Sequence, residues 1–285
     1  MSGGLGLAGR TVALLDSRTP FCLATVVYSG AGAEGMVAPG LKLIVLADGT
    51  VEGSLGSAAL DEAVRGAAVE QLRREDIALI RLTPQGRVLP GRRALRQAGA
   101  EGPVVEVSLE PMLPPPRLIV VGAGHIAVPL VRYARILGFE TTVIDDRERF
   151  ANRERFPDAD EIVVDDFRAA IARQEITPWT YLVLVTRGHE HDEATLRHVV
   201  DSPAPYIGMI GSRRRVLLVF QRLAAEGVPE HFIDRIYAPI GLDIGGRWPE
   251  EIALAIAAEM VNVRRGGKAR SLSLRRRAYN GQPDG

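Results

Sequence analysis

Cysteine is almost absent from this sequence: Cys22 is the only one in 285 residues. One thiol cannot form an intramolecular disulfide or a metal site made of several thiolates. Because Cys22 falls inside a predicted strand, we expect a buried structural thiol. The sequence also lacks an apolar run long enough to cross a bilayer, and a charged N-terminal region followed by an apolar segment. We therefore expect no membrane span, no signal peptide and a cytoplasmic protein.

Neither sign of charge is in excess, since 35 basic side chains balance 35 acidic ones. A general nucleic-acid-binding protein needs a basic surface, so we expect no nucleic-acid partner. The one local imbalance is the stretch 264–277, which contains arginines and a lysine but no acid. From it we predict that residues 266–285 form a basic, disordered tail.

A proline-rich connector divides the sequence. Pro111-Met-Leu-Pro-Pro-Pro116 predicts a stiff linker, because proline fixes its own backbone and lacks an amide donor. The residues before it, 1–110, predict a smaller α+β domain with one main helix. The expected strands are 21–28, 41–46, 77–82 and 104–109, and the expected helix is 55–72.

After the connector, apolar strands alternate with helical segments over residues 117–265. This alternation predicts an α/β fold in which a Rossmann-type parallel sheet has helices on both faces. The expected strands are 118–121, 141–144, 162–164, 181–185 and 206–210, and the main helices include 126–137, 196–200, 216–225 and 250–263.

A glycine-rich string, Gly122-Ala-Gly124-His125-Ile-Ala127, joins the first of these strands to a helix. In this context it predicts a phosphate site: Gly122 permits the tight turn, Gly124 allows close approach of a pyrophosphate, and Ala127 keeps helix and strand close. The helix N-terminus adds amides and a partial positive charge. The alternative is a glycine turn that only packs the strand against the helix.

The next strand ends in Asp145, followed by Asp146 and Arg147. An acid at this place typically binds a ribose hydroxyl, which favours an unphosphorylated ribose such as that of NAD or FAD. Arg147 is instead suited to the 2′-phosphate of NADP.

Three further loops leave strands at the ligand edge of the sheet. His189, His191 and Asp192 are candidates for a catalytic role or for a substrate-binding loop in which His191-Asp192 caps the next helix. Their close spacing is not typical of a metal site, and we expect none. The second loop holds Gly211, Ser212, Arg213 and Arg214, and the third holds Gly241 and Asp243. Arginines at the positive end of a helix predict a bound anion, with ion pairs to distant acids as the alternative. Glycines in the third loop allow close approach of a ligand, and Pro249 with two glutamates predicts a well-capped helix after it.

Together these loops resemble the xanthine dehydrogenase accessory proteins, the XdhC/CoxI family of molybdenum-hydroxylase maturation factors. The resemblance is carried by residues 121–127, 144–147, 186–192, 206–213 and 238–245. It implies binding of molybdenum cofactor (molybdopterin) and its delivery, often after sulfuration, to a client such as xanthine or carbon monoxide dehydrogenase. It also implies partners: the client, a fuller XdhC/CoxI homologue or a sulfur donor, with room for a homo-oligomer.

The N-terminal half departs from the family pattern. The resemblance implies a Ser-Ala-Pro-Arg stretch where this chain has residues 33–36, and a cysteine where it has Ala59. The missing cysteine argues against direct handling of sulfur or molybdenum by this half, as in a divergent CoxF-like member. Two other functions stay open: an NAD(P)-dependent oxidoreductase that uses the Rossmann domain for hydride transfer, and a nucleotide-binding sensory module.

Overall fold

A computed structural model describes residues 6–30, 37–89 and 104–270. The chain forms two compact units, Met1–Pro114 and Pro115–Gly285. The stretch 33–36 lies outside the described residues, as does most of the predicted tail, 271–285. Among the described helices, none is long and apolar enough to cross a membrane.

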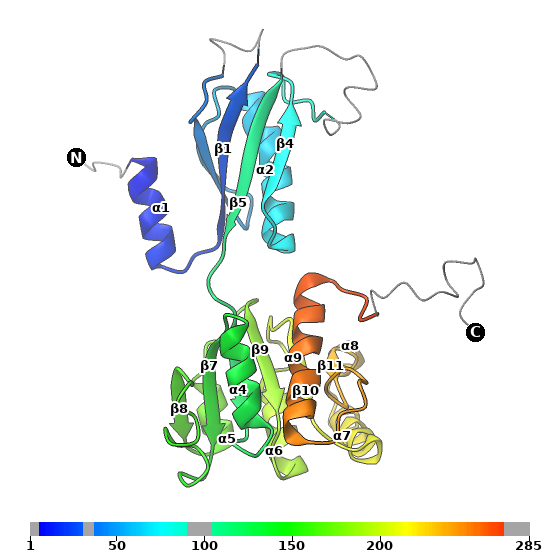
Figure 1. The fold of residues 1–285 in the computed structure, drawn as a ribbon. Helices are drawn as coiled ribbons and strands as arrows, with labels where there is room; N and C mark the ends of the chain where they lie inside the picture. Colours follow the sequence, from blue (N-terminus) through cyan, green and yellow to red (C-terminus); the bar gives the residue numbers. More distant parts are fainter. Residues whose placement is uncertain (1–5, 31–36, 90–103, 271–285) are drawn as a thin grey trace, which may run out of the picture. The chain divides into compact units, whose positions relative to one another are not determined.

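The first unit is an antiparallel sheet in the order β3-β2-β1-β5-β4, with helix α2 packed against it (Figure 1). Its elements are α1 (Leu7–Asp16), β1 (Phe21–Ser29), β2 (Lys42–Leu46), β3 (Val51–Gly53), α2 (Ala58–Arg74), β4 (Ala78–Leu82) and β5 (Val105–Met112). The four predicted strands and the predicted helix are present, whereas α1 and β3 were not predicted.

Strand β5 extends into the proline-rich connector. Pro111 pairs with Cys22 of β1, so the linker predicted to begin at residue 111 follows Met112 instead. Strand β4 pairs with β5 only as far as Leu109. Proline is tolerated here because β5 has a neighbouring strand on one side only.

The core of the first unit lies between the sheet and α2. Ser57 begins that helix, and its hydroxyl accepts a hydrogen bond from the Leu60 amide at 3.2 Å. Cys22 is fully buried in this core, as predicted. Burial raises the pKa of the Cys22 thiol to about 12.

The second unit is a six-stranded parallel sheet in the order β11-β10-β9-β6-β7-β8. Its strands are β6 (Arg117–Val121), β7 (Glu140–Asp145), β8 (Glu161–Val164), β9 (Thr180–Leu184), β10 (Tyr206–Met209) and β11 (Ile236–Tyr237). Numbered within this unit, the order is 6-5-4-1-2-3, the order of a Rossmann fold. The predicted fold class is confirmed, and the order of strands reverses between β6 and β9.

Helices cover both faces of this sheet (Figure 1). They are α4 (Ala127–Ile136), α5 (Phe167–Ala172), α6 (His189–His198), α7 (Arg213–Ala225), α8 (Glu230–Ile233) and α9 (Pro249–Arg265). Helices α4 and α9 pack on one face, and α5, α6 and α7 pack on the other. The central strands β6 and β9 are apolar after their first residues, Arg117 and Thr180, because both of their faces are buried.

Helix α6 begins earlier than predicted. The sequence pattern predicted helical residues 196–200 with His191-Asp192 as the cap, but the helix starts at His189, directly after Gly188. Glu190 and Asp192 lie in its first turn, where acids stabilise the helix dipole. His189, His191 and Asp192 are therefore helical residues and not part of a loop.

Candidate functional site

The glycine-rich loop lies where the strand order reverses. Gly122 has φ +107°, and a Cβ built there would lie 2.7 Å from the carbonyl oxygen of Val185, the residue that follows β9. Only glycine permits this turn and this approach of two backbone segments. The turn expected at Gly122 is present, and its reason is internal packing.

Gly124 is in a different position. Its backbone needs no positive φ, and a Cβ built there would find its nearest neighbour, Val185 O, at 4.0 Å. Nothing within the described chain requires glycine here. The space in front of Gly124 is open to a ligand that approaches the backbone.

Helix α4 starts directly after this loop without a side-chain cap. Its N-cap residue is Ile126, which offers no hydrogen-bond acceptor, and Ala127 is buried against the sheet as predicted. The first-turn amides of α4 therefore have no side-chain partner, and the helix dipole adds positive potential. His125 is exposed beside them. An anion at this place would complete the helix cap.

Asp145 does not face an open ribose site. Its side chain is 1% exposed, and its oxygens accept hydrogen bonds from the Ala123 amide at 2.8 Å, the Arg147 amide at 3.1 Å and the Arg147 guanidinium at 2.8 and 3.0 Å. Burial raises the pKa of Asp145, but the bonds from Arg147 and Ala123 outweigh it and hold the pKa below its ordinary value. The two residues that we expected at the ribose bind each other.

Arginine side chains also surround Phe150, which follows Asp145 in the chain. The Arg147 guanidinium lies 3.8 Å from the centre of the Phe150 ring, a cation–π distance. Arg155 donates to the carbonyl oxygens of Ala123 and Phe150, each at 2.7 Å. Asp146 is half-exposed and pairs with Arg187, which follows β9, at 3.5 Å. Both sides of the strand reversal are thus linked by charge.

Asp192 joins the first turns of two helices, α6 and α7, which the sequence predicted as parts of separate loops. It is fully buried, accepts from the Thr186 hydroxyl at 2.6 Å and pairs with Arg215 of α7 at 2.5 Å. Burial raises the pKa of Asp192, and the bond from Thr186 and the charge of Arg215 offset part of that shift. This pairing of Asp192 with Arg215 was not predicted.

Two of the catalytic candidates, His191 and Asp192, have different packing and hydrogen-bond partners. The ring of His191 packs against Phe167, with 4.7 Å between ring centres, while the Asp192 carboxylate is held by Thr186 and Arg215. The structure does not describe the His189 side chain. Within the described ranges, no cluster of three or more His, Cys, Asp or Glu could hold a metal ion.

The arginine turn divides into one paired and two unpaired side chains. Ser212 caps α7, and its hydroxyl accepts from the Arg215 amide at 3.3 Å, while Gly211 makes ordinary contacts with Arg215. Arg213 and Arg214 are exposed, and neither has a hydrogen bond or ion pair to any residue that the structure describes. Among the described residues, Arg215 thus has the ion pair with a distant acid that the alternative predicted, whereas Arg213 and Arg214 have none.

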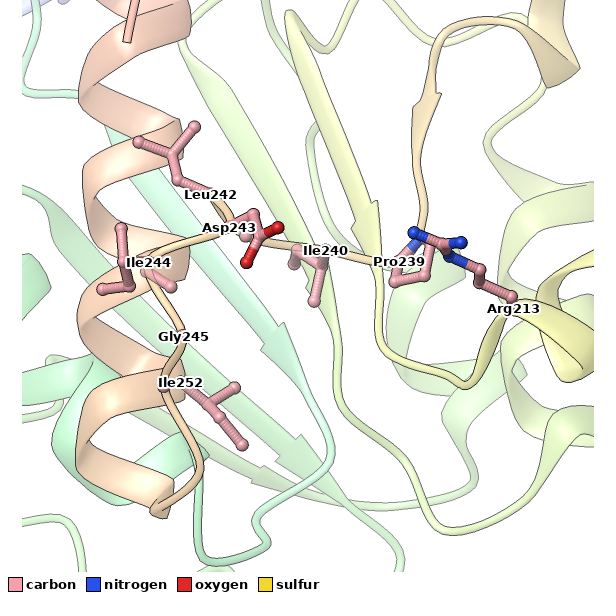
Figure 2. A pocket seen from close by; sticks show the side chains of 11 residues that line it. Arg213, Pro239, Ile240, Leu242, Asp243, Ile244, Gly245 and Ile252 are labelled. Carbon is pink, nitrogen blue, oxygen red and sulfur yellow. The ribbon is translucent and has the colours of Figure 1, made fainter. Parts of the chain in front are cut away.

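Arg213 lines a pocket of about 400 Å³ together with the loop that follows β11 (Figure 2). In Figure 2 Arg213 comes from the start of α7, and Pro239, Ile240 and Asp243 come from the loop that follows β11. Three predicted residues, Arg213, Gly241 and Asp243, thus share one pocket. The other residues that line it are mostly apolar: Pro239, Ile240, Leu242, Ile244, Gly245, Gly246, Ile252 and Ala255.

Glu259 of α9 holds the loop that lines this pocket. Its carboxylate accepts from the Gly241 amide at 2.9 Å and from the Tyr206 hydroxyl at 2.6 Å. Gly208 leaves room for the loop, since a Cβ there would lie 2.3 Å from Ile240 Cδ1. The role of Glu259 was not predicted, because an acid in the middle of an apolar helix carries no positional signal.

The start of α9 is capped as predicted. Pro249 is its first residue, and the Glu251 carboxylate accepts from the amides of Arg247 and Trp248 at 2.7 and 3.1 Å. These bonds lower the pKa of Glu251. Unlike α4, helix α9 thus has its own anion at its N-terminus.

Replacing Arg213 and Arg214 together with glutamine tests the anion site. We expect the free energy of unfolding of the ligand-free protein to rise by a few tenths of a kcal/mol, because two cations are removed from the positive end of α7. Affinity for inorganic pyrophosphate, measured by calorimetry, should fall at least tenfold, since two charge-assisted contacts are lost. The matched control is Arg215→Gln, which should lower stability by more than about 1 kcal/mol because buried Asp192 loses its partner. A double variant that is destabilised and binds pyrophosphate as tightly as before would assign these arginines a structural role.

Comparison with known proteins places this unit in a family. A sequence profile described as the XdhC Rossmann domain matches residues 118–260, and one described as the XdhC and CoxI family matches residues 14–82. An uncharacterized protein of Escherichia coli (strain K12), YqeB, is 29% identical over 258 residues, which are 88% of this chain and 45% of that protein. A Bacillus subtilis (strain 168) protein named as a probable xanthine dehydrogenase component is 33% identical over 152 residues, 53% of this chain and 44% of that protein.

The chain spans less than half the length of these curated relatives. A crystal structure of a xanthine dehydrogenase from Bacillus halodurans superposes with a TM-score of 0.49 at 21% identity, covering 94% of this chain and 98% of that one. The Rossmann match alone extends over half of the present sequence, and the second profile covers much of the first unit. The chain therefore belongs to the XdhC and CoxI family.

Proposed function

We propose that this chain binds a phosphate-bearing cofactor at the carboxyl edge of its parallel sheet and assists the maturation of a xanthine dehydrogenase-type enzyme. The observation that carries the proposal is the open space at Gly124, beside the uncapped start of α4. Packing within the protein does not require glycine at position 124, and the neighbouring helix amides have no side-chain partner. A phosphate that approaches the backbone closely requires both features.

The charges around this edge support an anionic ligand. Three acids at this edge are already engaged: Asp145 with Arg147, Asp192 with Arg215, and Glu251 with the start of α9. Asp243 lies in the same pocket as Arg213 but forms no ion pair with it among the described contacts. Arg213 and Arg214 lie at the positive end of α7 with no ion pair among the described residues. A bound anion would offset both the helix dipole and these two cations.

Molybdenum cofactor fits this donor set, and we propose it as the ligand. Its phosphate would be held by the amides after Gly124 and by Arg213, while Asp243 would accept N–H groups of the pterin in the pocket that Arg213 and Asp243 line. The metal chemistry that the cofactor supplies belongs to the client enzyme. This chain's residues bind the phosphate, orient the ring and cover it with apolar side chains.

Sulfuration of the cofactor falls to another protein in this proposal. Cys22 is buried, and its raised pKa keeps it a thiol at neutral pH, whereas sulfur transfer needs an accessible thiolate. Ala59, where the family resemblance implies cysteine, is exposed in the first turn of α2 but has no thiol. The partners that we propose are accordingly a xanthine dehydrogenase-type client and a separate sulfur donor or fuller homologue. The name of the Bacillus subtilis relative supports the choice of client.

The alternative function, NAD(P)-dependent hydride transfer, has less support from the side chains. Such an enzyme needs an acid–base group close to the nicotinamide and an acceptor for the ribose. His191 is packed on Phe167, and Asp145 is occupied by Arg147. Neither arrangement favours this chemistry.

Gly124→Asp should abolish binding of inorganic pyrophosphate while the protein keeps its thermal stability. The new side chain points into open space, so the fold tolerates it, but its bulk and charge block a phosphate. Gly122→Ala is the matched control, because its Cβ meets Val185 and the fold itself should lose stability. Unchanged affinity of folded Gly124→Asp in calorimetry would remove the glycine loop from the site.

Deletion of the gene tests the role in the cell. We expect the client hydroxylase to be expressed and folded but short of active cofactor, as the maturation role requires. Cofactor content and activity of the purified hydroxylase measure this, and a plasmid that carries the wild-type gene should restore both. Full activity and normal cofactor content in a deletion strain without a compensating homologue would contradict the proposal.

A further inference from the structure

The side of the site above β7 is filled by the chain's own side chains. In a Rossmann domain that binds a dinucleotide, the acid at the end of the second strand holds the adenosine ribose, and the adenosine lies over that strand. Here β7 is the second strand, and Asp145 is its last residue. The expected ribose acceptor is thus present in the sequence, but it can act only if a ribose can reach its carboxylate.

Asp145 has no acceptor capacity left. Two hydrogen bonds reach each carboxylate oxygen, one oxygen from the amide and Nε of Arg147 and the other from the Ala123 amide and a terminal nitrogen of Arg147. A carboxylate offers about four such positions. A ribose diol would have to displace the Arg147 guanidinium from a carboxylate that is 1% exposed.

That displacement is unfavourable, because Arg147 is held from three directions. Its guanidinium forms the forked pair with Asp145, lies 3.3 Å from an Asp146 oxygen, and stacks 3.8 Å from the centre of the Phe150 ring. Two neutral hydroxyls cannot replace a charge-assisted forked pair in a buried place. The Ala123 amide adds a second function: it fixes the glycine loop to the same carboxylate.

The opposite side of the strand reversal is open. The pocket of about 400 Å³ lies beside the loop after β11, and two of its lining side chains, Arg213 and Asp243, carry charges that no described residue neutralises. A ligand bound by its phosphate at the glycine loop can therefore extend toward β10 and β11 but not over β7.

We propose that Arg147 is the specificity-determining residue of this site: it closes the adenosine half and makes the chain reject dinucleotides such as NAD and FAD. The ligand class that remains is a phosphate ester of a single heterocycle whose organic part lies on the β10–β11 side. This inference rests on the anion site of the proposed function.

Calorimetry with two probes, inorganic pyrophosphate and NAD, tests the closure. The wild type should bind NAD no more tightly than pyrophosphate, because Arg147 leaves the ribose and adenine no contacts over β7. In Arg147→Ala the Asp145 carboxylate becomes available to the ribose. The affinity for NAD should therefore rise at least tenfold relative to the affinity for pyrophosphate. Adding Asp145→Asn to that variant should remove the gain. Arg149→Ala is the matched control: Arg149 also lies over Phe150, at 5.1 Å, but within the described ranges it makes no bond to Asp145, and the variant should behave as the wild type.

The outcomes separate this inference from the proposed function. Wild-type protein that binds NAD tenfold more tightly than pyrophosphate overturns the closure and leaves the anion site intact, and this arm needs no variant to fold. NAD binding to Arg147→Ala alone, with no pyrophosphate binding to the wild type, overturns the anion site and leaves the closure standing. A folded Arg147→Ala variant whose affinity for NAD does not rise overturns the closure. If that variant unfolds, Arg147→Lys replaces it, because lysine cannot form the two-pronged ion pair with Asp145.

Discussion

The close approach of Gly122 to the end of β9 is the constraint on which the C-terminal site depends. A Cβ atom at that position would lie 2.7 Å from Val185 O. The glycine-rich loop and the loop after β9 can therefore come together only because Gly122 has no side chain. Once they meet, the Ala123 amide reaches Asp145, and Thr186 begins the turn that buries Asp192. The phosphate loop, the closed ribose side and the buried ion pair all follow from this contact.

Charge pairing then decides which part of the edge stays available. Arginine forks use Asp145 and Asp192, and Glu251 supplies the anion for α9, whereas α4 and α7 have no acid in their first turns. Positive potential therefore remains at two helix N-termini on the same edge of the sheet. A protein that used this edge only as scaffold would be expected to neutralise these helices as it neutralises α9. The preserved positive charge is the physical reason to expect an anionic ligand.

The sequence predicted the sheet and its ligand edge because central parallel strands are apolar on both faces, a pattern that is visible without a structure. It did not predict the short elements α5, α8 and β11, which are too brief to show a period, or the start of α6 at His189. It named Asp145 and Arg147 correctly as neighbours at the edge but assigned both to a ribose. Whether an arginine turns back onto an adjacent acid depends on burial and on Phe150, which local sequence does not reveal. The Asp192–Arg215 pair was not predicted for a similar reason, since it joins two helices that follow different strands.

Identification of the natural ligand tests the central claim most directly. The protein would be purified from cells that express a molybdenum hydroxylase, and native mass spectrometry would compare the wild type with Gly124→Asp. The account predicts that the wild type carries a phosphate-bearing ligand with a single heterocycle, released on denaturation, and that Gly124→Asp carries none. Stoichiometric NAD or FAD on the wild type, or the same ligand retained on folded Gly124→Asp, would contradict it.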